Sequence, residues 1–345
     1  MKKINVDACH EHLFLKSPKL AFNQKNNYEE WKTQVSEKFH ELLCFDKIAE
    51  NKCELKVEIE EVIDELEYTR IRFTFESEKN CVVPCYLTVP KQDKEKYPLI
   101  ICLQGHSTGF HNTIGVAKYA RDVDTINTSA HALTALQYGF ASLAIEQRGM
   151  GERTTPRKDR GWALQCGCYH TVTTALLLGR TINGERAWDV ARAIDVLPQL
   201  ELSKYLDLED ITLLGHSGGG TATYYTAAYE KRIKYVVPCG CLCTYKDSIH
   251  EFWHCSCNYI PHIAEYFDMG EIAALIAPRK MVAAQGENDP IFPRPGANIV
   301  CNTIRDIYKK EGVPENFVHL YHRGQKHYFG KEEIFDALMK MRGEK

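Results

Sequence analysis

The chain has 345 residues, which is enough for one large α/β domain or two small domains. Its hydrophobic content of 44% and charged content of 26% are ordinary for a globular protein. The net charge of −3, without a basic run, gives no support for nucleic-acid binding. The sequence also shows no membrane-spanning apolar stretch and no apolar signal core at its N-terminus. We therefore expect a cytoplasmic protein that binds neither nucleic acid nor a membrane.

The first 66 residues are charged and helix-like. Between Tyr28 and Glu50 the apolar residues recur close to every 3.6 positions, which is the period of a helix with one buried face. We therefore predict that residues 1–66 form a helical N-terminal extension packed on a main domain of residues 67–345.

The main domain begins with two strand-like runs from Tyr68 to Pro90, separated by a polar turn, which predict an antiparallel hairpin at one edge of a sheet. After it, short apolar runs alternate with helical patterns. The runs predict strands at 98–103, 140–145, 211–214, 233–239, 280–286 and 317–321, and helices at 127–139, 171–197, 221–230, 296–311 and 331–341. The helix 171–197 should bend or break near Asn183-Gly184. This alternation indicates a mostly parallel, doubly wound sheet with helices on both faces.

One stretch carries a chemical motif. Gly215-His-Ser-Gly-Gly219 satisfies G-x-S-x-G, a tight turn from strand to helix that exposes a serine hydroxyl at the end of a parallel sheet. Glycines are needed there because side chains beside the nucleophile would collide with the strand and the helix. The motif follows an Ile-Thr-Leu-Leu run and precedes a helical pattern, so it predicts Ser217 as a nucleophile. A tight turn without chemistry is the alternative.

A serine hydroxyl becomes a good nucleophile only when a base takes its proton and a third group orients that base. For this kind of elbow the order along the chain is serine, acid, histidine. Asp289 fits the acid, just past the end of a predicted strand, with Glu287 as the alternative. His327 precedes the last helix and fits the base better than His319 or His322, which lie on or at the end of the last strand.

The reaction also needs two backbone donors for the oxyanion. We expect the amides of Gly218 and of His106, the latter from the glycine-bearing loop after strand 98–103. Residues 241–275 form a Cys-, His- and aromatic-rich insertion that is predicted to cap the acyl pocket. The predicted pocket residues are Gln104, His216, Trp253 and His254, with Phe252 and Tyr259 as further candidates in the insertion.

With these motifs in order, the chain resembles the α/β-hydrolase superfamily over about residues 65–342, and within it the acetyl xylan esterases and dienelactone-hydrolase-like esterases. Stretches that look particular to one bacterial, acetyl xylan esterase-like branch are Tyr169-His170, 177–180, 188–195, 254–258 and 273–278. The resemblance implies the α/β-hydrolase fold, a triad of Ser217, Asp289 and His327, and oxyanion donors at His106 and Gly218.

Two motifs depart from the pattern of this family. Sugar acetyl esterases often have His-Gly-Tyr where this chain has Gln104-Gly-His106, and Arg-Gly-Gln where it has Arg148-Gly-Met150. Both departures leave the triad intact and change the surroundings of the substrate. Small acetylated sugars, other intracellular esters and xylan therefore all stay open as substrates.

Fourteen cysteines include three close groups: Cys166-Gly-Cys168, Cys239-Gly-Cys241-Leu-Cys243 and Cys255-Ser-Cys257. One interpretation is a metal site, since these thiols, with His170 and His254 nearby, are soft ligands, and residues i and i+2 of a strand share a face. The usual structural zinc pair has two to four residues between its cysteines, whereas these pairs have one. The sequence therefore favours reduced, buried thiols that act as small apolar side chains, and we predict no bound metal.

These observations predict a serine carboxylic-ester hydrolase that acts through an acyl-enzyme, on small acyl (acetyl) esters of carbohydrates or related small molecules. No metal or organic cofactor is expected. A prolyl-oligopeptidase-like peptidase shares the triad but usually has a large N-terminal propeller, which 66 helical residues cannot form. The third interpretation is a thiol- or metal-binding protein that uses the hydrolase scaffold only for its shape. The sequence leaves open whether the chain forms a homo-oligomer.

Overall fold

The computed structural model describes residues 6–25, 27–92, 94–154 and 167–344. In this part of the chain one nine-stranded sheet has the order β1-β2-β3-β5-β4-β6-β7-β8-β9. The strands are β1 (Val57–Asp64), β2 (Tyr68–Glu78), β3 (Cys81–Pro90), β4 (Tyr97–Leu103), β5 (Ala141–Ile145), β6 (Leu206–His216), β7 (Ile233–Cys239), β8 (Lys280–Gly286) and β9 (Phe317–His322). Neighbours from β5 to β9 are parallel, and β1 to β3 pair antiparallel. The predicted mostly parallel α/β sheet is confirmed.

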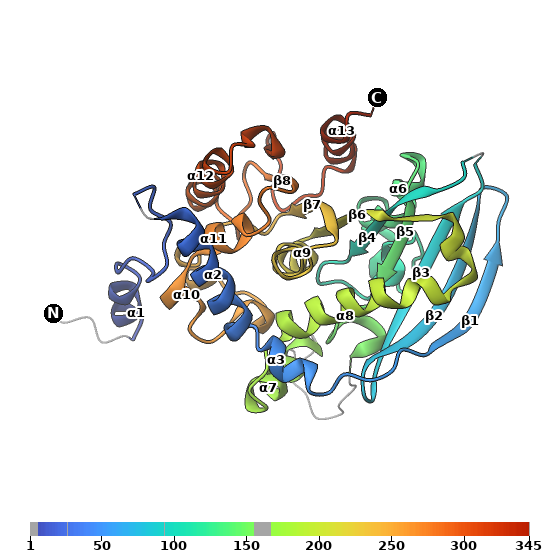
Figure 1. Cartoon of the computed structure of the whole chain (residues 1–345), viewed down its shortest axis with the longest axis horizontal. Helices are drawn as coiled ribbons and strands as arrows, with labels where there is room; N and C mark the ends of the chain where they lie inside the picture. Colours follow the sequence, from blue (N-terminus) through green and yellow to red (C-terminus); the bar gives the residue numbers. More distant parts are fainter. Residues whose placement is uncertain (1–5, 26, 93, 155–166, 345) are drawn as a thin grey trace.

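Helices cover both faces of the sheet (Figure 1). One face carries α2 (Tyr28–Leu42), α3 (Phe45–Ala49), α8 (Ile182–Val196), α9 (Gly218–Tyr229), α11 (Met269–Ala274) and α12 (Arg294–Lys310), and the other carries α6 (His131–Gln137) and α13 (Lys331–Arg342). A hydrophobic core lies under the helices on each face, and alternate residues of a strand point to opposite faces. In β4, Leu99 and Ile101 pack into the core of the first face and Ile100 packs into the core of the other. Within the described residues, no helix is both long and apolar enough to cross a membrane.

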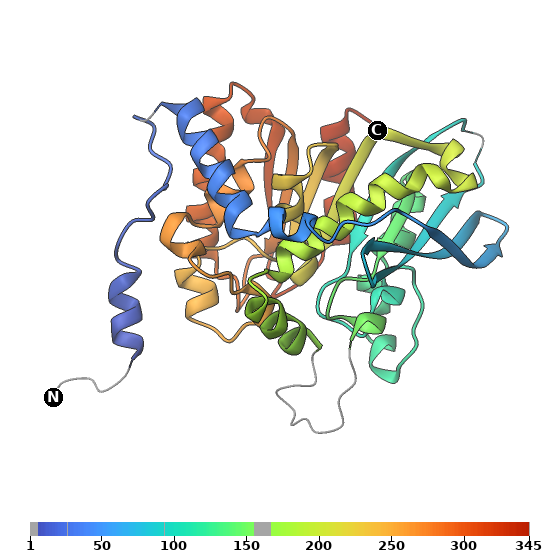
Figure 2. The same ribbon diagram turned by 60° about the horizontal axis from the view of Figure 1, so that its bottom comes forward.

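The N-terminal segment is helical only up to Ala49. It comprises α1 (Asp7–Leu13), α2 and α3, and then continues as β1, the edge strand, which the sequence did not indicate. None of the four apolar side chains of β1 is fully buried, and Ile59 and Val62 are 53% and 59% exposed, so main-chain pairing with β2 contributes more to this strand than burial does. Helix α1 lies at the periphery of the molecule (Figure 2).

The predicted long helix at 171–197 is two helices, α7 (Gly167–Leu177) and α8. The break lies at 178–181, where Gly179 has φ +67° and the Thr181 hydroxyl caps α8 by accepting from the Gly184 amide at 3.3 Å. The bend expected near Asn183-Gly184 is therefore displaced, and that pair forms the first turn of α8. A β-carbon at Gly184 would lie 2.0 Å from the Leu43 carbonyl oxygen, so close packing against the N-terminal segment explains this glycine.

Residues 241–275 contain two short α-helices, α10 (Ile263–Tyr266) and α11, after a π-helical turn at Lys246–His250 and a 3-10 turn at Ser256–Asn258. Leu242, Ile249 and Phe267 are buried in the same core as the sheet strands and α12. The segment therefore packs into the body of the domain, and it reaches the region of the predicted active site through Cys257, which contacts His106.

Candidate active site

Ser217 lies between the end of β6 and the start of α9, as the elbow motif predicts. Its backbone angles, φ 56° and ψ −122°, are strained for a residue with a side chain, and its amide donates to the Cys239 carbonyl at 2.8 Å. The neighbouring glycines are sterically required. A β-carbon at Gly219 would lie 2.1 Å from the carbonyl oxygen of Leu103 at the end of β4.

Asp289 and His327 meet at the same edge of the sheet. Asp289 follows β8, is 3% exposed, and its Oδ2 is 2.7 Å from Nδ1 of His327. Its other oxygen accepts from the amides of Ile291 and Phe292 at 3.0 and 3.1 Å, which fixes the carboxylate. The remaining ring nitrogen of His327, Nε2, is buried and has no hydrogen-bond partner among the described residues. The imidazole therefore has a basic nitrogen available for a reacting group.

The alternative acid and bases are engaged elsewhere. The side chain of Glu287 pairs with Arg294 at 2.7 Å and accepts from the Gly324 amide at 3.0 Å. His322 is 1% exposed and hydrogen-bonds to Glu333. His319 lies on β9, with its Nδ1 3.4 Å from an Arg305 nitrogen. The geometry thus favours Asp289 and His327, the first choices from the sequence.

The loop after β4 packs directly on the elbow. A β-carbon at Gly105 would lie 2.9 Å from the His216 carbonyl oxygen and 3.2 Å from Cβ of Ser217, so only glycine allows this approach. Gln104, a predicted pocket residue, lines the cavity, but its side-chain nitrogen donates to Glu146 and its backbone carbonyl accepts from Nε2 of Gln147 at 2.5 Å. Gln104 therefore also holds the loop in place.

Glu146 lies beneath this loop, at the end of β5, and is fully buried. Its carboxylate accepts from Gln104 and from the amides of Phe110 and Glu152, both at 3.3 Å. Burial raises the pKa of Glu146 to about 7, although the two amides act in the opposite direction. The charge of this carboxyl group therefore changes near neutral pH.

Ser217 and His327 line one cavity of about 920 Å³ together with His106. Much of the remaining wall carries hydroxyl and amide groups, from Ser107, Thr108, Asn112, Thr113, Thr125, Thr128, Ser129 and Thr154. Such a wall offers many hydrogen-bond donors and acceptors and suits a polar ligand.

The other predicted pocket residues have different positions. His216 lines the cavity, with its ring 4.8 Å from that of His327. Burial, and secondarily the neighbouring His327, keeps the pKa of His216 well below its usual value, so its ring is neutral behind the base. Trp253 is 80% exposed, and His254 is buried with its Nε2 3.1 Å from the Ser248 hydroxyl. Neither of the last two is among the described residues that line the cavity.

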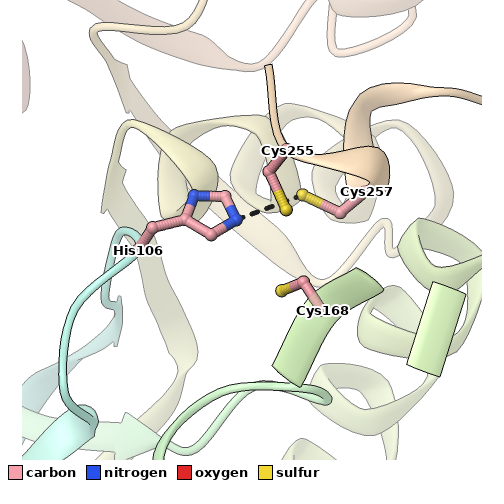
Figure 3. A group of neighbouring side chains, drawn as sticks. All are labelled: His106, Cys168, Cys255 and Cys257. Carbon is pink, nitrogen blue, oxygen red and sulfur yellow. Dashed lines mark hydrogen bonds between the residues drawn. The ribbon is translucent and has the colours of Figure 1, made fainter. Parts of the chain in front are cut away.

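The cysteines divide into two sets. Cys239, Cys241 and Cys243 are buried in the hydrophobic cores, as predicted for apolar thiols. Cys168, Cys255 and Cys257 instead surround the ring of His106 (Figure 3). Sequence reasoning had placed His170 and His254 beside the cysteines, and it missed His106 because this residue is 151 positions from Cys257. Cys166 lies outside the described residues.

Comparisons with known proteins agree with this architecture. A profile described as "Abhydrolase family" matches residues 7–178. "Putative hydrolase YtaP" of Bacillus subtilis (strain 168) is 26% identical over 242 residues, covering 67% of this chain and 74% of the relative. A Bacteroides fragilis structure described as a "putative acetyl xylan esterase" has a TM-score of 0.80 at 16% identity, and the match covers 99% of this chain and 96% of the Bacteroides chain. A glucuronoyl esterase from Solibacter usitatus has a TM-score of 0.66 at 17% identity, and the match covers 95% of this chain and 97% of the esterase chain.

The sheet order, the strained serine after β6 and these likenesses converge on one fold, which confirms the resemblance seen in the sequence. Residues 7–178 match the Abhydrolase family model, and the chain has the α/β-hydrolase fold of the solved acetyl xylan esterase-like structures.

Proposed function

We propose that the protein is a serine carboxylic-ester hydrolase that acts through an acyl-enzyme on small acyl esters of carbohydrates or related small molecules. The observation that supports this proposal is that Ser217 and His327 line one cavity while the buried Asp289 holds His327 from behind. Ser217 stands at the elbow, His327 presents an unpartnered Nε2, and Asp289 holds the opposite ring nitrogen at 2.7 Å.

In this mechanism the Ser217 hydroxyl attacks the ester carbonyl while Nε2 of His327 takes its proton. Asp289 fixes the imidazole tautomer and stabilises the imidazolium ion that forms. The amides of Gly218 and His106 are the proposed oxyanion donors, since their loops meet at the elbow. His327 then gives the proton to the leaving alcohol, which departs and leaves Ser217 acylated. In the second half, His327 activates a water molecule, which releases the acid and restores the serine.

The cavity supports a carbohydrate ester as the substrate class. Its wall of hydroxyl and amide groups can hydrogen-bond to a sugar, whereas an acyl chain of any length would need a larger apolar surface. The similar solved structures include proteins described as an acetyl xylan esterase and a glucuronoyl esterase, which are esterases of carbohydrates by name. We therefore place acetylated sugars ahead of long-chain acyl esters.

The test is the Ser217→Ala variant with p-nitrophenyl acetate as substrate. We expect hydrolysis to fall to the background rate while the circular dichroism spectrum and the melting temperature stay close to those of the wild type. A serine-directed fluorophosphonate should label the wild-type peptide that contains Ser217 and should not label the variant. Full turnover by Ser217→Ala would remove the proposal.

Substrate class needs a second assay, because the triad alone does not separate esters from peptides. A panel should compare acetylated mono- and oligosaccharides, p-nitrophenyl esters of increasing chain length, and short proline-containing peptides. We expect turnover of the acetylated sugars and short esters. Faster cleavage of the peptides would instead favour a peptidase.

A further inference from the structure

We propose that His106, Cys168, Cys255 and Cys257 form a structural zinc site that holds the loop of the oxyanion donor His106. Nε2 of His106 and the three Sγ atoms all lie within 4.8 Å of one another, and Nε2 is 3.3 Å from Cys257 Sγ. Figure 3 shows the ring and the three sulfur atoms directed toward a common point. The metal content predicted here does not depend on the proposed esterase activity.

The donor set fits zinc in number, kind and size. Three thiolates and one imidazole are an established structural zinc combination, and Zn–S and Zn–N bonds of about 2.3 and 2.0 Å place tetrahedral ligands about 3.5–3.8 Å apart. The four ligand atoms lie within 4.8 Å of one another, so small side-chain rotations would bring them to these tetrahedral ligand–ligand distances. Four protein ligands leave no coordination position for water or substrate, so the ion would be structural rather than catalytic.

Charge balance supports the same ion. Three thiolates and Zn²⁺ carry a net charge of −1, which is costly to bury without a cation. The guanidinium of Arg186 is 2% exposed, and its Nη2 donates to Cys168 Sγ at 3.2 Å. Its Nη1 is buried and has no hydrogen-bond partner among the described residues. Arg186 would therefore neutralise the site and act as the outer-shell donor that thiolate ligands usually have.

The three cysteines are buried in apolar surroundings, whereas His106 is exposed where it lines the cavity. Cys168, Cys255 and Cys257 belong to a small buried cluster with Met150, Val172 and Ile182. In addition, the Asn258 side-chain nitrogen lies 3.9 Å from Cys257 Sγ, at the limit of an N–H···S contact. The cysteine side of the cluster thus combines an apolar environment with polar donors near sulfur, which is the usual environment of metal thiolates.

The site would join three segments that are distant in the sequence. His106 lies in the loop after β4, Cys168 in the first turn of α7, and Cys255 and Cys257 in the 241–275 segment. Binding would release the protons of the three thiols and fix the His106 ring, and with it the backbone amide proposed as an oxyanion donor. Loss of the ion should therefore loosen the oxyanion site without removing Ser217, Asp289 or His327.

The experiment measures metal in the full chain, expressed in zinc-supplemented medium and purified without a metal-affinity tag. Inductively coupled plasma mass spectrometry should find close to one zinc ion per chain, since structural sites bind zinc tightly enough to retain it during purification. Cys168→Ala and Cys257→Ala should lose most of this zinc. Cys301→Ala is the matched control, because Cys301 is equally buried but lies in α12, away from the cluster. Its zinc content should equal that of the wild type.

Two further measurements keep the result decisive if the cysteine variants fold poorly. Titration of wild-type thiols with a mercurial should release zinc to a colorimetric chelator, and Co²⁺ exchanged into the protein should show sulfur-to-cobalt charge-transfer absorption. Ser217→Ala should keep its zinc, so failure of the esterase proposal and failure of this one are distinguishable. A wild-type protein that holds no zinc and shows no such absorption with Co²⁺ overturns the proposal.

Discussion

The imidazole of His106 lies directly against Gly218, since a β-carbon added at Gly218 would be 2.6 Å from Nδ1 of the ring. Gly105 also lies close to the backbone of His216, because a β-carbon added there would be 2.9 Å from the His216 carbonyl oxygen. The loop after β4 and the nucleophile elbow are therefore in close contact, with Gly105 against the elbow backbone and the His106 ring against Gly218. Because this contact joins the two loops, it sets the relative position of the two proposed oxyanion donors, the amides of His106 and Gly218.

Gly218→Ala tests this contact. The new methyl group must displace the His106 ring or the elbow, and either movement changes the distance from the donor amides to the oxyanion. We expect kcat to fall by roughly 10²–10³-fold, the range seen when one oxyanion donor is lost, with a smaller change in KM. Steady-state kinetics with p-nitrophenyl acetate measure this, with circular dichroism as a check on folding. An unchanged kcat would show that this contact does not position the oxyanion site.

Asp289→Asn tests the orienting role of the acid. An asparagine keeps the shape of the side chain but offers an NH₂ group to Nδ1 of His327, which favours the wrong imidazole tautomer. By analogy with serine hydrolases of other folds, we expect kcat to fall about 10³–10⁴-fold. The matched control is Glu287→Gln, two residues away, because Glu287 pairs with Arg294 outside the triad. Its kcat should stay within a few-fold of the wild type. Equal losses in both variants would contradict the assignment of the acid.

The sequence was sufficient for the positions of strands β2 to β9 along the chain and for the three triad candidates. Each of these rests on a local pattern: a buried run for a strand, or glycines around a serine. The cysteine–histidine cluster has no such local pattern, because its four residues come from three segments and His106 lies 151 positions from Cys257, which it contacts. The edge strand β1 was missed for a related reason. Its side chains are mostly exposed, so pairing with β2, a long-range interaction, decides its conformation.

Glu146→Gln tests the buried carboxyl group beneath the oxyanion loop. The pKa of Glu146 is raised from 4.5 to about 7 by burial, so between these two values the unfolded chain loses a proton that the folded chain keeps. The free energy of unfolding should therefore fall as pH rises from about 4.5 to 7, by at most a few kcal/mol, since each pKa unit corresponds to about 1.4 kcal/mol. Below this range both states are protonated, and above it the full destabilisation is present.

Urea unfolding of the wild type and of Glu146→Gln across pH 4.5–8 measures this effect. The buried Asp268 also has a pKa raised to about 7, chiefly by burial, so the wild-type slope contains more than one group. The difference between the two proteins isolates Glu146, and the variant should gain stability relative to the wild type as pH rises. A difference that stays constant with pH would show that Glu146 does not titrate in this range.

Arg148→Met tests a buried ion network behind the cavity. Nε and Nη2 of Arg148 donate to the two oxygens of Asp189 at 2.8 and 2.7 Å, and Nη2 also donates to Glu78 at 2.5 Å. Arg148 is 8% exposed, and the carboxylates of Asp189 and Glu78 are buried as well. Methionine would leave these acids with less positive charge in a region that water reaches poorly. We expect a loss of about 3–5 kcal/mol in the free energy of unfolding, as for other broken buried pairs.

The control for this variant is Arg294→Met, because the Arg294 side chain is 51% exposed where it pairs with Glu287. Exposed pairs contribute about 0–1 kcal/mol, so this variant should unfold close to the wild type. Chemical denaturation of the wild type, Arg148→Met and Arg294→Met gives the loss in free energy of unfolding for each variant. Gly149 and Met150, which follow Arg148, line the cavity, so Arg148→Met should also lower kcat/KM for an acetylated sugar. Similar stabilities for the two variants would mean that the network around Arg148 is dispensable for the fold.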